Sequence, residues 1–480
     1  MELRQIIFHL LEMQIQFGVH RFGDVLPTIK EASGYFLASA DTVRLAYQRL
    51  KQKGYLSIST CVGATVKVKY SDDEVRQHVQ DYFACRKAPL LAFAQSVGLL
   101  ANHAQWFAFK RAAPETLDEL ERICFQKHIP PVYRMSRQLQ LLYSPLGNDL
   151  LLRLFWQMFL YFQAPFVSAP QNIETVNRQD RPILRMVQLA RNKDWTALWN
   201  VGEETVKAYY DALRRFFEKD IQVGSDGEPV DFTWGIYKKA SQLCYSLCTE
   251  ILAGVGDGVY PVGCLLPSPQ RLAGEKQIGL NTVRRSICLL NKLGATRSVN
   301  GVGTLVLTPL ECARNCDFSD AVIQKRLLGF LQSIHLLSFS CRACARVTVA
   351  GLDADQLRQW LHALENVQRL GNYEGLLYIC YRSISRYAPY HAIRTIYSEL
   401  TQQFLWGFPL QRLHGDRASI NAYFSPYLEA LMGCLARADA DGFSAKLEEL
   451  QLVELAHTAQ YLTALGVQEA SVLVLPDKVV

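Results

Sequence analysis

The chain has 480 residues, of which 49% are apolar and 20% are charged, and its formal net charge is +6. This length predicts about three or four domains, and so mild a charge permits a polyanionic partner without requiring one. The 13 cysteines show no framework spacing and Met1 to Leu11 lacks the pattern of a secretory signal, so we expect free thiols in a reducing cytoplasm. The longest apolar segment, Leu150 to Val167, contains Arg153, which favours a buried amphipathic helix over a membrane span.

The first 69 residues predict three helices followed by a β-hairpin. Apolar residues recur at helical spacing in the first helix: Leu3, Ile6, Ile7, Leu10 and Leu11. The second helix follows its N-cap Thr28, and the third, capped by Ser39, spans Ala40 to Lys53. Two β-rich runs within Tyr55 to Val68 flank Val62-Gly63, which predicts a hairpin.

This order of elements is that of a winged helix, whose third helix fits the major groove of DNA with its first residues facing the base edges. Thr42 and Arg44 stand at those positions, where a hydroxyl and a guanidinium can reach bases or phosphates. A solvated helix face is the alternative interpretation of Arg44. Gly63 at the hairpin tip allows close backbone approach to DNA and equally serves a tight turn. The segment is basic with a net charge of +3, from one acidic and four basic residues: Asp41, Arg44, Arg49, Lys51 and Lys53.

Residues 70–218 carry recurring helical stripes and no convincing alternation, which predicts a bundle of about six helices. Most of its many aromatic residues are expected in the core. One or two of them are candidates to line a ligand cavity together with Gln95, Asn148 or Arg153. Residues 219–232 contain KDIQVGSDGEPVD, a polar run with two glycines and a proline, which predicts a linker.

The second half repeats the first at a constant offset of 240 positions. Between Gly23 and Val68, 12 of 46 positions are identical to their counterparts, whereas ordinary composition gives about three by chance. The bundles share a phrase as well, since LLAFAQSVGLL (Leu90 to Leu100) matches LLGFLQSIHLL (Leu327 to Leu337). We therefore interpret the chain as one unit written twice.

The elements predicted for the second half follow from this repeat. A helix is expected from Trp234 to Gly254, Ser268 is the N-cap of the next, and Asn281 to Lys292 is the second recognition helix. Its wing spans Ala295 to Leu307, with the tip Gly301-Val302-Gly303-Thr304. In the second bundle, four unranked residues are candidates for a ligand cavity: Gln332, Tyr378, Tyr381 and Arg382.

The predicted fold class is mainly α, with two winged helix-turn-helix domains that alternate with two α-helical bundles. The predicted domains are a first winged helix at 1–69, a first helical domain at 70–218, a linker at 219–232, a second winged helix at 233–308, a second helical domain at 309–470 and a tail at 471–480.

The phrase LPSPQRLA…LNTVRRSICLLNKLG…GVGT resembles the winged helix of the GntR family of bacterial transcription regulators. That family's domain usually reads G-x-x-L-P-S-E-R-x-L-A, then V-S-R-x-T-V-R, then a G-x-G-T wing. The resemblance covers about 45 residues in each half. The bundles resemble, in architecture alone, the effector-binding and dimerising domain of the FadR branch. The resemblance implies a cytoplasmic DNA-binding regulator controlled by a small metabolite, here as two subunits fused into a pseudo-dimer.

Both halves depart from the family's pattern. The family's DNA-contacting arginine on the second helix falls at Lys30 and Gln270, and the one that opens the recognition helix falls at Ala40 and Leu280. Such a bidentate arginine contributes about 1–3 kcal/mol to base discrimination. We therefore expect an operator unlike the family's, binding through the remaining contacts, or one segment that no longer binds DNA. The first wing also carries Cys61 where the second has Gly301.

No metal, cofactor or enzymatic activity is predicted. The aspartate and three histidines that hold a metal in many FadR-branch proteins have no counterpart at the expected spacing. Cys341-Arg-Ala-Cys344 has metal-type spacing without a second pair nearby. The sequence contains no nucleophile elbow, P-loop or dinucleotide fingerprint, and neither bundle shows the strands of an aminotransferase-like domain.

The leading hypothesis is a transcription regulator that binds an asymmetric operator in double-stranded DNA and responds to an unidentified small-molecule effector in the helical domains. The alternative is a sensor or interaction protein whose winged helices have lost specific DNA binding. A homodimer of the whole chain is left open, and no membrane partner is expected. The candidate DNA contacts are Lys30, Thr42, Arg44, Gly63, Ser268, Gln270, Asn281, Thr282, Arg284, Arg285, Gly301, Gly303 and Thr304.

Overall fold

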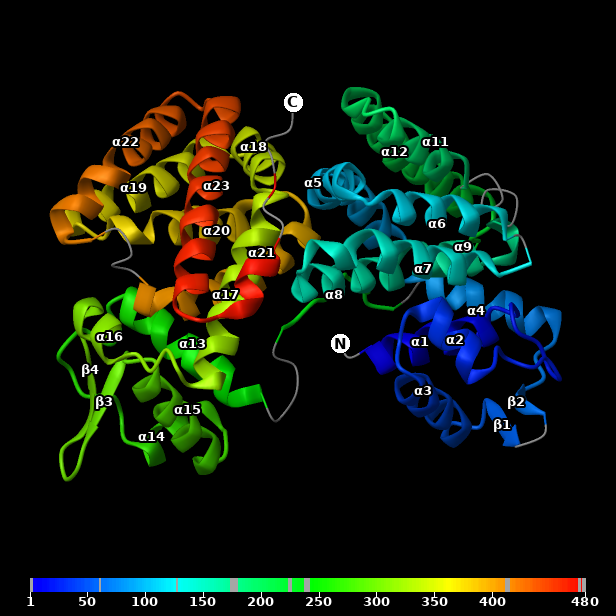
Figure 1. Cartoon of the computed structure of the whole chain (residues 1–480), viewed down its shortest axis with the longest axis horizontal. Coiled ribbons are helices and arrows are strands. Elements are labelled where there is room, and N and C mark those ends of the chain that lie inside the picture. The colour runs from blue at the N-terminus through cyan, green and yellow to red at the C-terminus, as the bar shows by residue number, and fades with distance from the viewer. Residues whose placement is uncertain are drawn as a thin grey trace. The chain divides into compact units, whose positions relative to one another are not determined.

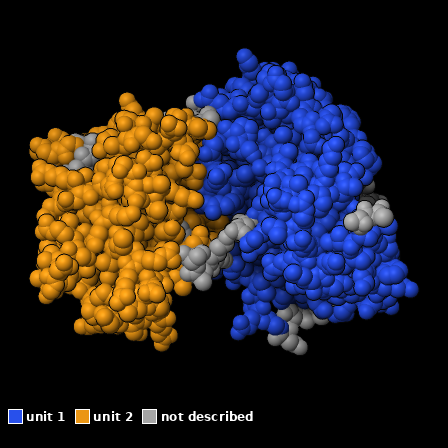
Figure 2. Space-filling model, turned by 60° about the horizontal axis from the view of Figure 1, so that its bottom comes forward, with its two compact units in different colours: residues 1–233, 390–392, 477–480 blue, residues 234–389, 393–476 orange. Residues whose placement is uncertain are grey.

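The computed structural model describes residues 3–59, 62–126, 128–172, 180–222, 227–236, 242–410, 415–473 and 476. The protein is mainly helical, with two short β-hairpins (Figure 1). It divides into two compact units (Figure 2). Unit 1 holds residues 1–233, 390–392 and 477–480, and unit 2 holds residues 234–389 and 393–476.

Unit 1 begins with the predicted helix–turn–helix and hairpin. Its elements are α1 (Leu3–Gln16), α2 (Ile29–Phe36), α3 (Ala40–Gln52), β1 (Leu56–Ser59) and β2 (Gly63–Val66). The two strands pair antiparallel, with Leu56 opposite Val66. The connection before α2 adds to the hairpin, because the Leu26 amide donates to the Ala64 carbonyl at 2.8 Å. Leu26, Val43 and Val66 are buried, so helices and hairpin share one small core.

A helical domain completes unit 1. Its long helices α5 and α12 pack along each other, and α6 and α7 lie beside them (Figure 1). Its elements are α4 (Asp72–Ala84), α5 (Lys87–Arg111), α6 (Pro114–Phe125), α7 (Pro131–Tyr143), η1 (Ser144–Leu146), α8 (Asp149–Met158), the π-helix η2 (Phe159–Gln163), α9 (Ala164–Ser168), η3 (Pro170–Asn172), α11 (Asp180–Arg191) and α12 (Trp195–Lys219).

The apolar segment from Asp149 to Ser168 forms α8, η2 and α9. By length and composition alone this continuous helix could cross a membrane, but 67% of its most apolar window is buried inside the unit. Core helices of soluble proteins commonly have this composition. Its burial agrees with the predicted buried helix.

The predicted linker is not wholly a free connection. Helix α12 extends to Lys219, and the Val230 amide donates to the Cys85 carbonyl at 2.9 Å. Phe232 is buried and packs on the rings of Phe93 and Tyr161. The burial of Phe232 therefore holds the end of the predicted linker against the rest of unit 1.

Unit 2 begins with the same order of elements. They are α13 (Leu243–Gly256), α14 (Pro269–Lys276), α15 (Leu280–Lys292), β3 (Thr296–Val299) and β4 (Gly303–Val306). We call residues 243–306 the second repeat. Its connection repeats the first, because the Leu266 amide donates to the Thr304 carbonyl at 2.8 Å. The helix predicted from Trp234 starts later, and Trp234 itself lies buried outside any helix.

The rest of unit 2 is helical. One buried core joins it to the second repeat, running from Leu252 and Leu290 through Leu331 to Trp406 and Leu462. Its elements are α16 (Pro309–Asn315), α17 (Ala321–Ser338), α18 (Cys341–Ala350), α19 (Ala354–Leu370), η5 (Tyr373–Gly375), α20 (Leu376–Tyr387), α21 (His391–Phe404), η6 (Leu405–Leu410), α22 (Arg417–Ala436), α23 (Ala440–Ala464) and η7 (Gln468–Val472).

The predicted tail, residues 471–480, also differs from a free end. Its first part belongs to η7, and Leu473 is buried in the core of unit 2 together with Ala470. The burial of Leu473 therefore fixes this part of the chain.

Candidate nucleic-acid interface

Side-chain caps and one left-handed residue fix the turn between α2 and α3. Thr28 and Glu31 form a capping box, in which the Thr28 amide donates to Glu31 Oε2 at 2.8 Å. Leu37 ends α2 with a φ of 45°, a conformation that costs a non-glycine residue about 1–2 kcal/mol. Ser39 Oγ then accepts from the Thr42 amide at 3.2 Å and starts α3. The turn thus presents the first residues of α3 at the surface.

The predicted contacts on α2 and α3 lie at that surface, but two of them already have partners. Lys30 and Arg44 are exposed, and Arg44 forms an ion pair with Asp41 one turn earlier. The Thr42 hydroxyl is 2.8 Å from Ser39 Oγ. Arg44 must therefore exchange a carboxylate for DNA if it is to bind there.

Two other basic residues of this segment, Arg49 and Lys53, contact α1. Lys53 Nζ lies 2.9 Å from Glu12 Oε1, and the Arg49 guanidinium lies 4.5 Å from the centre of the Phe8 ring. Their charges stabilise the packing of α1 against α3. The net charge predicted for this segment is therefore not all available on the groove-facing side.

The first wing is narrow, with an apolar side chain at its tip. Gly63 has a φ of 91°, as a hairpin turn requires. Val62 beside it is 60% exposed. Cys61 lies outside the described residues.

In the second repeat, α14, α15 and the turn between them have the same local geometry as α2 and α3. Ser268 Oγ accepts from the Arg271 amide at 3.3 Å and starts α14. Gln277 ends α14 with a φ of 52°, at the position equivalent to Leu37. Gln270, exposed on α14, stands where α2 has Lys30.

The outer face of α15 carries more unscreened positive charge than that of α3. Asn281, Arg284 and Arg285 are exposed, and Thr282 is half-buried. Asn281 replaces Asp41, so no carboxylate stands one turn before Arg284. Lys292, at the far end, pairs with Asp320 at 2.5 Å.

The β3–β4 hairpin places three of the four residues predicted at a second wing tip in the open. Gly301 and Gly303 have φ values of 74° and 139°, and Val302 between them is 62% exposed. Thr304 is 8% exposed, and its hydroxyl lies 3.2 Å from Ser298 Oγ. The strand register turns this side chain inward, so Thr304 is placed to stabilise the hairpin.

Tyr133 of α7 links the first helix–turn–helix to its helical domain, a contact that the sequence did not predict. The Tyr133 hydroxyl lies 2.7 Å from His20 Nε2. Its ring stacks on Tyr35, at 5.5 Å between centres and 17° between planes, and meets Phe36 edge to face. Burial lowers the pKa of His20 to about 4, so His20 is neutral near pH 7. Some 100 residues separate these side chains, so no periodicity reveals them.

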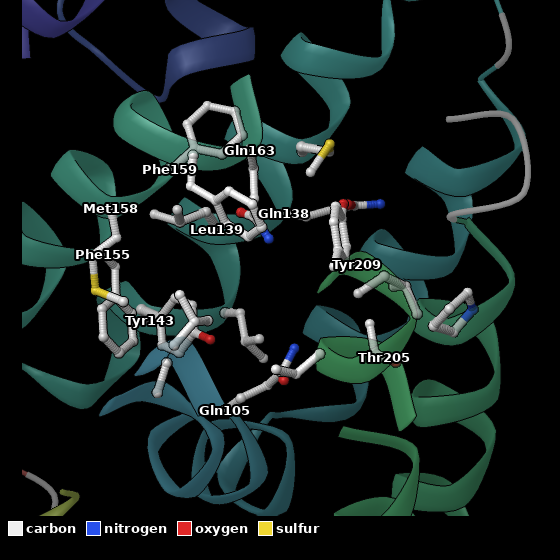
Figure 3. Close-up of a pocket in the computed structure, with 18 of the residues that line it drawn as sticks. Gln105, Gln138, Leu139, Tyr143, Phe155, Met158, Phe159, Gln163, Thr205 and Tyr209 are labelled. Carbon is white, nitrogen blue, oxygen red and sulfur yellow. The ribbon is translucent and has the colours of Figure 1, made fainter. Parts of the chain in front are cut away.

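A half-open cavity of about 180 Å³ lies on the other side of α7, lined by residues of α5, α6, α7, α8, η2, α11 and α12. Figure 3 shows Gln138, Gln105 and Tyr209 around the open space, with Phe155 and Phe159 at one side. The three polar residues proposed from the sequence do not line it. Asn148 caps α8, Arg153 Nε donates to the Asp149 carbonyl, and Gln95 Nε2 donates to the Tyr210 hydroxyl at 3.3 Å.

A second cavity of about 150 Å³ lies in unit 2, between α13 and the helical domain. Of the four residues proposed there, Tyr378 lines it. Arg382 pairs with Asp257 at 2.5 Å, and the Tyr381 hydroxyl donates to Gln451 Oε1 at 2.5 Å. Gln332 is buried in α17.

Among the described residues, no group of three or more His, Cys, Asp or Glu side chains could hold a metal ion. Cys341 and Cys344 are fully buried in α18. Burial raises the pKa of both thiols, as expected for packing residues.

Comparisons with known proteins give a family for the first of these regions. Residues 3–66 match the family model "Bacterial regulatory proteins, gntR family". No curated protein matches the chain.

Solved structures that resemble part of the chain include two that are named as GntR proteins. A Streptococcus agalactiae GntR is 16% identical, covering 44% of this chain and 99% of its own, with a TM-score of 0.20. Lar, which controls the agr system of Listeria monocytogenes, is 13% identical, covering 47% and 99%, with a TM-score of 0.23. A GntR family member from Pseudomonas syringae pv. tomato is 18% identical, covering 48% and 90%, with a TM-score of 0.21. Residues 3–66 of this protein form a DNA-binding domain of the gntR family of bacterial regulatory proteins.

Proposed function

We propose that the chain is a fused pseudo-dimer in which residues 3–66 and the second repeat are two winged helices that bind neighbouring major grooves of one operator. Winged helices of dimeric regulators contact half-sites about one helical turn apart. The fusion would give two DNA-binding segments in one cytoplasmic bacterial polypeptide. The proposal also assigns the second repeat a function that the family match does not cover.

The observation that carries this proposal is that α2 and α14, and likewise α3 and α15, begin and end at residues 240 positions apart. Leu37 and Gln277 both have left-handed backbones, and Val43 and Val283 are both fully buried. Arg44 and Arg284 are both exposed one turn into the recognition helix. A helix kept only for packing need not keep an exposed arginine at this position.

The two segments differ in charge, and from this we infer an asymmetric operator. α3 presents Asp41 and Leu45 where α15 presents Asn281 and Arg285. The negative Asp41 is thus replaced by a neutral residue, and the neutral Leu45 is replaced by a positive one. The second repeat should contribute more of the affinity, and the two half-sites should differ in sequence.

Selection of binding sites from random duplex DNA at low salt tests the proposal, with the full chain and with Arg44→Ala and Arg284→Ala variants. A two-part motif, of which each variant loses one part, is the expected result. Arg76→Ala is the matched control, because Arg76 is an equally exposed arginine of unit 1 that pairs with Asp73 on α4. A single half-site that depends only on Arg284 would refute two-part binding. The absence of any enriched sequence would refute sequence-specific DNA binding by this chain.

Effector control is part of the proposal, and α7 is the element that we propose transmits it. One face of α7 lines the cavity through Arg134 and Gln138. The residue before Arg134, Tyr133, contacts α2 and His20. A ligand that moves α7 would therefore move the helix–turn–helix, which changes DNA affinity if the two positions bind DNA differently.

A second candidate function has one observation in its favour, the apolar character of both wings. Val62 and Val302 at the tips are exposed, as are Val25 and Leu265. Val25 forms a β-bridge with Thr65, and Leu265 forms one with Leu305. Exposed apolar side chains at matched positions suit a protein partner. The salt dependence of binding separates the two functions, because a DNA complex weakens steeply as salt releases counterions.

A further inference from the structure

An open groove with a polar lining lies between α1 and α3, which pack side by side in residues 3–66 (Figure 1). We call it the α1–α3 groove, and its volume is about 240 Å³. Two of its lining side chains are positive, three are amides, and no carboxylate is among the described lining residues. The groove therefore offers positive charge and hydrogen-bond donors to an anion. The residues that line it are Arg4, Gln5, Leu45, Ala46, Gln48, Arg49 and Gln52.

Arg49 is positioned at this groove by an aromatic ring. Its guanidinium carbon lies 4.5 Å from the centre of the Phe8 ring, and Phe8 is fully buried. A guanidinium that lies over a ring face keeps the N–H groups at its edge for other partners. Among the described residues Arg49 forms no ion pair, because Glu12 of α1 pairs with Lys53 instead. The charge of Arg49 is therefore available to a ligand in the groove.

The three glutamines add donors without adding charge. Gln48 and Gln52 are exposed one helical turn apart on α3, and the half-buried Gln5 lines the same groove from α1. Amide nitrogens donate to oxyanions, and an arginine fork matches the oxygens of a phosphate. A phosphate in the groove would thus be contacted from two helices.

The groove lies where a DNA backbone passes when α3 enters the major groove. An α-helix with its side chains is about 10–12 Å across, and the major groove is about 12 Å wide. A sugar-phosphate backbone therefore runs along each flank of the inserted helix. Gln48 follows Arg44 by one turn on the exposed side of α3 and also lines the α1–α3 groove. The anion that the groove meets in a DNA complex is therefore a backbone phosphate.

The second repeat lacks this set of side chains. At an offset of 240 positions, Cys244 stands for Arg4, Cys288 for Gln48 and Leu289 for Arg49. Cys244 and Leu289 are buried in unit 2. Apolar side chains are therefore enough to pack these two helices together. The polar lining in the first repeat is not required by the fold, which favours a role in binding.

We propose that the α1–α3 groove binds one backbone phosphate of double-stranded DNA, held by Arg49, Gln48 and Gln52. The inference rests on DNA binding by residues 3–66, which is part of the proposed function, and it needs neither a specific operator nor a second half-site. Phosphate contacts position a protein on the duplex without reading its sequence. The contact supplies affinity to a segment whose Arg44 is paired with Asp41.

Fluorescence anisotropy of the full chain with a labelled duplex of mixed sequence, at several salt concentrations, tests the proposal. Gln48→Glu places a carboxylate in the groove with little change in side-chain size. It should weaken binding roughly threefold or more at low salt and make the slope of log K against log salt shallower by about 0.9, the contribution of one phosphate. Gln188→Glu, on an exposed glutamine of α11, is the matched control and should change neither quantity.

Arg49→Gln should make the slope shallower by the same amount, and thermal unfolding shows whether the lost contact with Phe8 affects the fold. If Arg49→Gln does not fold, the exposed Gln48→Glu still decides. Affinity and slope in Gln48→Glu equal to those of Gln188→Glu, or weaker binding with an unchanged slope, would overturn the proposal.

A free anion is the other source of the same chemistry, and inorganic phosphate is its probe in isothermal titration calorimetry. Phosphate binding that Gln48→Glu removes, with DNA affinity unchanged, would overturn the assignment to DNA. The selection of binding sites decides the proposed function separately. A two-part motif with an unchanged slope in Gln48→Glu would keep the regulator and remove this contact, whereas a shallower slope without any enriched motif would keep the contact and remove the specific operator.

Discussion

Exchanging one residue between α3 and α15 tests whether Asp41 limits DNA binding by α3. Asp41 pairs with Arg44, and Asn281 stands at the equivalent position before Arg284. Asp41→Asn should therefore strengthen DNA binding, and Asn281→Asp should weaken it. Neither change alters the shape of the side chain much, so the difference is one of charge.

The expected magnitude follows from two small terms. Breaking an exposed ion pair such as Arg44–Asp41 costs about 0.2–1 kcal/mol. Removing a carboxylate that would lie about 8 Å from a DNA phosphate removes roughly 0.5 kcal/mol of repulsion in water. Together they amount to about 1 kcal/mol, or a three- to tenfold gain in affinity for Asp41→Asn. If Arg44 then contacts one additional phosphate, the slope of log K against log salt should steepen by about 0.9.

Fluorescence anisotropy with a labelled duplex containing the selected site, at several salt concentrations, measures both quantities. Thermal unfolding of each variant is needed beside it, because Asp41 lies in the first turn of α3, where a carboxylate stabilises a helix by about 0.3–1 kcal/mol. Asp73→Asn on α4 is the control for a general loss of negative charge. Unchanged affinity and slope in Asp41→Asn, with the fold intact, would show that this pair does not limit binding.

Three further predictions concern stability and coupling. Gly54 has a φ of 85° and open space around it, so Gly54→Ala should lower the free energy of unfolding by about 1–2 kcal/mol. In Gly294→Ala the new Cβ would also collide with the Cys312 carbonyl oxygen, so this variant should lose about 1–3 kcal/mol more, as measured by chemical denaturation. Equal losses in the two variants would contradict the close packing of α16 on Gly294. The buried His20, with a folded pKa of about 4 against 6.5 unfolded, contributes stability that is complete above pH 6.5 and is lost as pH falls toward 4, so unfolding at pH 5 should be easier than at pH 7 by about 2 kcal/mol from this group; His20→Gln should remove that part of the pH dependence, and an identical pH profile would refute it. Tyr133→Phe keeps the ring contacts and removes the hydrogen bond to His20, so the free energy of unfolding should decrease by about 0.5–1.5 kcal/mol; an unchanged midpoint in chemical denaturation would show that this bond does not stabilise the contact between α7 and the helix–turn–helix.

Local signals in the sequence predicted the helix–turn–helix well. The N-caps Thr28, Ser39 and Ser268 are found as predicted, because a cap depends on residues three positions apart. The turn residues Leu37 and Gln277 were not predicted, since neither type favours a left-handed backbone. The repeated core positions around them impose it.

Contacts between distant residues could not be predicted. Phe232 looked like part of a polar linker, and only its pairing with Phe93 shows that it is buried. Thr304 looked like a wing-tip residue until the strand register turned it inward. The cavity could not be predicted for the same reason, because Arg134 and Gln138 have one-turn spacing like many exposed pairs, and the rest of the lining comes from six other elements of the fold.

The continuous core of unit 2 determines where the chain can be cut. Leu252 and Leu290 of the second repeat are buried in the same cluster as Leu331, Trp406 and Leu462 of the helical domain. A fragment that ends after the hairpin would leave one side of that cluster in water, and an exposed apolar surface of this kind promotes aggregation. A piece that carries the second repeat with this cluster intact must therefore run at least from Leu247 to Leu473, and a shorter fragment should be redesigned on its inner face before any transplant into another protein.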